Sequence, residues 1–190
     1  MALEAFEFKQ FSVAHDRCAM KVGTDAVLLG AWASVDHRPN AILDIGAGSG
    51  ILALMLAQRS AAELIDALEI DASAYEQCVA NFEQSPWGDR LFCYHASLEE
   101  YTEEIEDKYD YIFFDCPPSF FITSQCAIFS SDHIMVPANP DALSIIGFHL
   151  LVDKLESFNK QSYRWRQELS VPEPQILGIS LNAVKLGTNI

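Results

Sequence analysis

The chain has 190 residues and a mass of 21.2 kDa, which is the size of one ordinary or one large domain. Half of the residues are hydrophobic and 21% are charged, so a sizeable core can form and global disorder is excluded. The 12 Lys and Arg against 27 Asp and Glu give a net charge of −15, which argues against a surface that binds nucleic acid throughout and leaves open only a local basic patch.

Short β-branched or aromatic segments alternate with longer helical patterns along the chain. The pattern predicts strands over residues 41–45, 64–70, 91–95, 109–115, 132–137 and 175–184. It predicts helices over residues 51–58, 72–84, 124–129 and 143–158. The acidic segment 99–107 is expected to be an exposed helix or loop, and 161–174, with two prolines and no apolar period, a loop. This alternation predicts an α/β fold with a doubly wound, mostly parallel sheet covered on both faces.

A glycine-rich segment, Asp44-Ile-Gly46-Ala-Gly48-Ser-Gly50, follows the first of the buried strands and precedes a helix. Glycines let the backbone turn tightly and approach a ligand, and a helix N-terminus offers free N–H groups. A dinucleotide fingerprint would require a further glycine at position 51, where Ile51 stands. The segment resembles motif I of the class I methyltransferases, and this resemblance implies a Rossmann-like architecture and S-adenosylmethionine as cofactor.

A carboxylate, Glu69, ends the next predicted strand about twenty residues after the loop. There a carboxylate can accept both ribose hydroxyls of a bound nucleoside, whereas Asp66 and Asp71 beside it are expected to be solvated. The alternative is a tight structural turn with an unrelated surface glutamate. In the methyltransferase family an Asp after the third strand usually contacts the adenine; Ser97 takes that place here and predicts a weaker contact.

The N-terminal segment 8–32 carries a long and unusual pattern. Together with Asp44–Gly50 and the segments 52–59, 65–71 and 81–87, it closely resembles the bacterial tRNA(Val) adenine-N(6) methyltransferases, over about residues 6–98. Those enzymes modify an adenine beside the anticodon, so the resemblance implies tRNA as a partner. It also implies that four residues help to close the cofactor pocket: Lys21, Gly23, Thr24 and Asp25. Three cations are candidates for RNA phosphate contacts, or alternatively ordinary surface cations: Lys9, Arg17 and Lys21.

In that family, catalysis uses an N/D-P-P-Y/F motif at the end of the fourth strand. The Asn or Asp and the first proline's carbonyl accept the protons of the adenine amine, and the aromatic ring stacks on the flipped base. The corresponding candidate catalytic residues are Cys116, Pro117, Pro118 and Ser119. A thiol accepts an amine proton poorly, and Asp115 stands one residue too early, which on a strand means the opposite face. Catalysis is therefore expected to be weak or lost, and Cys116 is alternatively a buried small hydrophobe.

The segment from residue 108 onward resembles a different family, the ParA-type partition ATPases. The resemblance rests on the segments 109–119, 131–141, 143–147 and 176–182. It implies that Asp115 is the Walker B aspartate and that Asn182 lies near a nucleotide base. The glycine loop is followed by Ile51 rather than by the lysine that cradles β- and γ-phosphates, so ATP hydrolysis is not expected.

The chain thus resembles a chimera, with a methyltransferase-like front over 1–108 and an ATPase-like back over 109–190. Both parents have doubly wound parallel sheets, so we expect a single α/β domain with one continuous sheet over residues 1–190. Three functions stay open: a cofactor-binding methyltransferase, a partition-ATPase-like module, and a non-catalytic chimeric or engineered domain. No metal site is predicted, and the oligomeric state is left open.

Three further features bear on the compartment. Five cysteines contain no C-x-x-C pair, which favours a reducing compartment over a disulfide framework. The first residues lack the order of a secretion signal, and the apolar runs are too short to span a bilayer. We therefore expect a cytoplasmic protein without a membrane partner.

Overall fold

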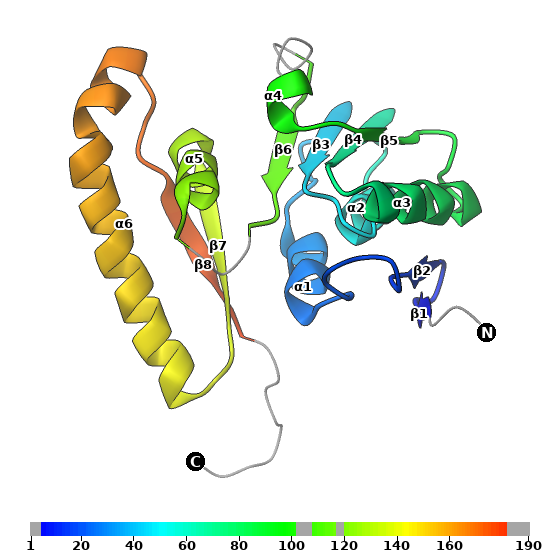
Figure 1. Cartoon of the computed structure of the whole chain (residues 1–190), viewed down its shortest axis with the longest axis horizontal. Helices are drawn as coiled ribbons and strands as arrows, with labels where there is room; N and C mark the ends of the chain where they lie inside the picture. The colour runs from blue at the N-terminus through cyan, green and yellow to red at the C-terminus, as the bar shows by residue number, and fades with distance from the viewer. Residues whose placement is uncertain (1–4, 102–107, 117–119, 182–190) are drawn as a thin grey trace. The chain divides into compact units, whose positions relative to one another are not determined.

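A computed structural model describes residues 5–101, 108–116 and 120–181. The chain divides into two compact units, Met1–Asp115 and Cys116–Ile190, and each has a sheet of its own among the described strands (Figure 1). The boundary lies close to residue 108, where the two resemblances meet. The expectation of a single domain with one continuous sheet stays a prediction.

The first unit is built on a four-stranded sheet in the order β5-β4-β3-β6. Its strands are β3 (Ala41–Ile45), β4 (Leu64–Glu69), β5 (Leu91–His95) and β6 (Tyr111–Phe114). All three neighbouring pairs are parallel. A separate antiparallel hairpin joins β1 (Ala5–Glu7) to β2 (Ser12–Ala14). The α/β class and the parallel sheet predicted from the alternating patterns are confirmed.

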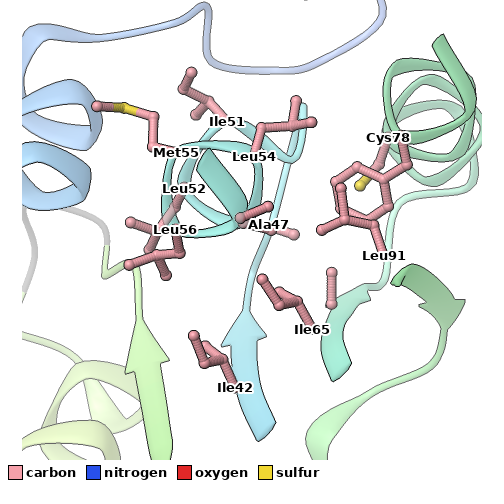
Figure 2. Packing of buried hydrophobic residues seen from close by; sticks show 14 of the residues in the cluster. Ile42, Ala47, Ile51, Leu52, Leu54, Met55, Leu56, Ile65, Cys78 and Leu91 are labelled. Atoms are coloured by element: carbon pink, nitrogen blue, oxygen red, sulfur yellow. The ribbon is translucent and has the colours of Figure 1, made fainter. Parts of the chain in front are cut away.

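Helices of the first unit pack against both faces of this sheet. They are α1 (Thr24–Trp32), α2 (Ile51–Arg59), α3 (Ala72–Gln84) and the short α4 (Leu98–Tyr101). The main core lies around α2, seven of whose nine residues are buried, and includes Ile42 and Ile65 from the sheet (Figure 2). A smaller cluster of Leu43, Leu68 and Tyr101 lies on the other face. Because side chains alternate along a strand, the two clusters account for the continuous apolar runs of β3 and β4.

The second unit contains a parallel pair of strands and two helices. The elements are α5 (Ile122–Ser130), β7 (His133–Ala138), α6 (Ala142–Leu169) and β8 (Gln175–Leu181). The predicted helix end at residue 158 is wrong, and the predicted loop over 161–174 is confirmed only for 170–174, because α6 runs for 28 residues to Leu169. Its last turns bury Ser162 and Arg166 instead of apolar side chains, so an apolar period could not reveal them. Arg166 donates to the carbonyls of Phe129 and Pro172 and thereby anchors the end of α6.

No helix among the described residues is both long enough and apolar enough to cross a membrane.

Candidate functional site

The strand order places a topological switch point beside β3. The chain leaves β3 for β4 and β5 and then returns to β6 on the other side of β3. In open α/β sheets, ligands bind outside the carboxyl ends of the strands at such a point, because the connections diverge there and leave a crevice. The glycine loop follows β3 at this position, so the fold and the motif indicate the same place.

The backbone of the glycine loop explains its residue types. Gly46, Gly48 and Gly50 have φ values of 83°, 54° and 79°, in the left-handed region that favours glycine. A Cβ atom on Gly50 would also lie 2.5 Å from the Phe82 ring, whereas one on Gly48 would meet no described atom within 4 Å. Gly50 is therefore required for packing beneath the loop, while Gly48 lies where the loop faces open space.

Glu69 lies directly beside this loop. It is 8% exposed, and its two carboxylate oxygens accept hydrogen bonds from the N–H groups of Gly48 and Asp71, each at 2.8 Å. The carboxylate is thus fixed between the glycine loop and the start of α3. Asp71 is exposed, as expected, and its side chain caps α3 by accepting from the N–H groups of Ser73 and Ala74.

Asp44 is fully buried, and neither of its carboxylate oxygens has a hydrogen-bond partner among the described residues. Burial raises its pKa from 3.8 to about 7, and the negative charges of Asp115 and Glu69 contribute to the rise. Asp115 is exposed as a residue, yet desolvation of its carboxyl group and the charge of Asp25 raise its pKa as well. Several acidic side chains therefore lie near the C-terminal ends of the strands, and each raises the pKa of a neighbour instead of compensating its charge.

The residues expected to close the pocket lie at the start of α1. Gly23 is the N-cap of this helix, and a Cβ atom there would collide with the Asp25 carboxylate, which bends back over it. Lys21, Thr24 and Asp25 are exposed. The sequence did not reveal how the segment from Ala14 to Arg17, which leads to α1, is attached: the buried side chains of Asn81 and Gln77 in α3 form hydrogen bonds with it.

Asn81 provides the more informative of these attachments. Its amide group donates to the carbonyls of Ala14 and Ser49 and accepts from the N–H of Ala14, all at 2.8–2.9 Å. One side chain thus joins α3, the end of β2 and the glycine loop. Asn81 belongs to a segment that carries the methyltransferase resemblance, but a polar residue on a helix does not by itself identify such a role.

The remaining candidates are less well supported. Ser97 is engaged by Glu100, which accepts from both its N–H and its hydroxyl at 2.8 and 3.0 Å. Cys116 is exposed, so the alternative of a buried small hydrophobe is wrong: the residue lies just beyond β6, where the sheet ends. Four residues with expected roles lie outside the described part of the chain: Pro117, Pro118, Ser119 and Asn182.

One polar cluster was not predicted at all. Asp66, expected to be solvated, is fully buried, because β4 is covered on both faces. Its Oδ2 atom accepts hydrogen bonds from the hydroxyls of Tyr101 and Tyr109 at 3.1 and 2.5 Å and forms an ion pair with Lys108 at 2.9 Å. Alternation along β4 puts Asp66 on the face of Leu68, away from Glu69. The cluster therefore belongs to the second core rather than to the glycine-loop site.

Comparisons with known proteins bear on both resemblances. A family model described as an AAA domain matches residues 51–171, which is more than half of the chain. The chain belongs to the AAA domain family. This membership supports the resemblance of the second half of the chain to ParA-type partition ATPases.

Curated relatives match more than half of the chain. The tRNA1(Val) (adenine(37)-N6)-methyltransferase of Christiangramia forsetii is 66% identical over 119 residues, which are 62% of this chain and 50% of that protein. The enzyme of the same name from Flavobacterium johnsoniae is 72% identical over 107 residues, 56% of this chain and 46% of that protein. The AAA-family chain thus spans about half the length of the curated relatives it matches, and the resemblance to the tRNA(Val) adenine-N(6) methyltransferases is confirmed.

Among solved structures, an O-methyltransferase from Bacillus cereus in complex with SAH is 22% identical. The match covers 53% of this AAA-family chain and 48% of the other, with a TM-score of 0.42.

Proposed function

We propose that the first unit binds S-adenosylmethionine and that the chain acts as a methyltransferase on the exocyclic amine of an adenine in tRNA. The observation that carries the proposal is the glycine loop held beside the buried Glu69 at the switch point of the sheet. The names of the curated relatives support the substrate class. A tRNA substrate also agrees with the cytoplasmic location expected from the sequence.

The residues at the loop fit this cofactor. Gly48 leaves open space that a Cβ atom would enter, and Asp44 in β3 carries a buried carboxyl group without a described partner. Glu69 would hold the ribose, because each carboxylate oxygen can accept a further hydrogen bond beside the one it has. When bound, the cofactor supplies a methyl group on a positively charged sulfur. In the same proposal, Ser97 contacts the adenine, and Lys21, Gly23, Thr24 and Asp25 close the pocket.

A cofactor titration tests this proposal. S-adenosylmethionine or its demethylated product at millimolar concentration should raise the melting temperature, because a ligand that binds only the folded state stabilises it. Glu69→Ala should weaken the binding by roughly tenfold through the loss of two ribose hydrogen bonds. Glu63→Ala, which changes an exposed glutamate just before β4, is the matched control and should bind normally. A folded protein whose melting temperature does not respond would exclude the proposal.

Activity on tRNA needs a separate measurement, because the residues at the amine position differ from the family motif. Methyl transfer to an unmodified tRNA(Val) transcript is expected to be slow, since the Cys116 thiol is a poor proton acceptor. The double variant Cys116→Asn, Ser119→Tyr restores an N-P-P-Y motif and should increase labelled methyl incorporation by at least roughly tenfold. If the double variant binds cofactor and incorporates no more methyl than the parent chain, the amine-methylation part of the proposal fails.

A second candidate is a partition-ATPase-like module, favoured by the AAA family match. Asp115 would then organise Mg²⁺ and the attacking water. Mg²⁺–ATP should stabilise the protein against heat if this candidate holds. We expect no such shift, because the sequence has no lysine after a glycine loop to hold the phosphates.

A further inference from the structure

Three carboxylates share one side of the sheet at the glycine-loop edge. β3 and β6 pair so that Asp44 lies opposite Phe113, and the N–H of Asp115 donates to the carbonyl of Ile45 at 3.3 Å, which continues the ladder beyond β6. Side chains two residues apart along a strand point to the same face. Asp115 therefore lies on the face of Phe113 and Asp44, and alternation along β4 puts Glu69 on this face too.

Of these three carboxylates, Asp44 is the one whose buried charge is not compensated by hydrogen bonds. Glu69 accepts two backbone N–H groups, whereas both oxygens of Asp44 are buried and have no partner among the described residues. A buried carboxyl group in this condition gains most from an added positive charge or from its own proton, because water is excluded. An unpartnered buried acid at a ligand-binding edge is therefore stabilised by its own proton or by a cationic ligand.

The groups that face Asp44 come from every neighbouring element. They are Asp115 beyond β6, Glu69 at the end of β4 and Cys78 in α3, while the backbone N–H of Ala53 in α2 favours the charged form. Asp25 in α1 faces Asp115. Each charged side chain in this set is acidic, so a cation that enters meets attraction from several directions.

We infer that Asp44 and Asp115 make the site selective for ligand charge, so that it binds the positively charged sulfonium cofactor more tightly than the neutral thioether product. The inference rests on the proposed function, because it concerns the same cofactor. It adds that the carboxyl groups, and not only the shape of the loop, distinguish the two forms. Methyl transfer removes the positive charge from the sulfur, so the same groups favour release of the product.

Proton binding to Asp44 gives the selectivity a pH dependence. Burial raises the pKa of Asp44 to about 7, so the group is largely neutral at pH 6 and charged at pH 8. A cation stabilises the charged form, so its binding displaces the proton. The preference for the cationic ligand should therefore increase with pH through this range.

The test measures dissociation constants by calorimetry for three ligands: S-adenosylmethionine, S-adenosylhomocysteine, and sinefungin, in which a carbon bearing an ammonium group replaces the sulfonium. Both cationic ligands should bind more tightly than S-adenosylhomocysteine. Asp115→Asn should reduce this preference by roughly fivefold, the size expected for one charge interaction at a partly solvated site. Asp89→Asn removes an exposed charge before β5, near the amino edge of the sheet, and should leave the preference unchanged.

Each outcome decides between the two proposals. A preference that is equal in the parent chain and Asp115→Asn, and constant between pH 6 and pH 8, overturns the inference while the cofactor site stands. Tighter binding of the neutral thioether than of both cations also overturns it. If none of the three ligands binds the folded protein, the proposed function itself fails, and the inference fails with it.

Discussion

Two fully buried aspartates on neighbouring strands have opposite surroundings. Asp66 on β4 faces the smaller core, where the hydroxyls of Tyr101 and Tyr109 and the ammonium of Lys108 converge on one of its oxygens. Asp44 on β3 faces the glycine-loop side and has no described partner for either oxygen. The strands pair directly, so the difference arises from which face each side chain occupies and not from depth.

A buried carboxylate can serve the structure or serve a ligand, and Asp66 and Asp44 differ in this respect. A carboxylate that receives several donors can be retained because it holds elements together, and Asp66 joins β4 to α4 and to the start of β6. Burial works against the charge of Lys108, and its bonds to Asp66 and Tyr101 outweigh burial, so its pKa is raised. Asp44 has no hydrogen-bond partner that meets both of its oxygens' needs, and the favourable effect of the Ala53 N–H does not offset its burial, so it contributes no such stability. Its presence is better explained by a ligand that supplies the missing charge.

The largest change in the free energy of unfolding is expected at Asp66, the aspartate that has hydrogen-bond partners. Asp66→Ala should lower the free energy of unfolding by about 3 kcal/mol, because Lys108 and two hydroxyls lose their common acceptor. Urea unfolding at pH 7 measures it, with Glu63→Ala as the control next to the same strand. A loss below about 1 kcal/mol would mean that the cluster contributes little, and the contrast with Asp44 would then disappear.

Much of this fold was predictable because the sheet is buried on both faces. Runs such as 41–45 and 64–70 are apolar enough to be identified as strands, and the glycine loop that follows the first of them indicated a ligand-binding turn. The end of α6 was not predictable. There, burial of Ser162 and Arg166 replaces apolar contacts, and hydrogen bonds from Arg166 hold the helix end in a way that no periodic pattern records.

The candidate site was predictable where backbone geometry dictates residue type. Glycines with positive φ and a carboxylate at the next strand end are local requirements, so Gly46, Gly48 and Glu69 could be identified from their spacing together with the resemblance to motif I. The attachment by Asn81 and the contrast between Asp44 and Asp66 depend on which distant residues pack nearby. Long-range contacts of this kind are set by tertiary structure, which a single sequence does not display.

An intermediate effect, of opposite sign, is expected at Asp44. Its folded-state pKa is raised, so the folded protein binds the proton more tightly than the unfolded chain, and the parent protein loses stability as pH rises from about 4 to about 7. Asp44→Asn removes this loss. Between about pH 5.5 and 7, the variant should gain about 2 kcal/mol relative to the parent, at about 1.4 kcal/mol per pH unit. Unfolding curves across this range measure it, with Asp89→Asn as control, and a pH-independent difference would show that Asp44 has a partner.

The smallest effect is expected from one hydroxyl of the Asp66 cluster. Tyr109→Phe keeps the ring that packs near Leu43 and Leu68 but removes the donor at 2.5 Å from Asp66, so we expect a loss of about 1 kcal/mol. The loss is small because Lys108 and Tyr101 still reach the same oxygen. Tyr75→Phe, where the ring stacks on His95, is the matched control for removing a hydroxyl and should change stability less. Tyr109→Phe is also combined with Asp66→Ala. Once the carboxylate is absent, Tyr109→Phe should lower the free energy of unfolding no further. A remaining loss would mean that the hydroxyl acts through Tyr101 instead.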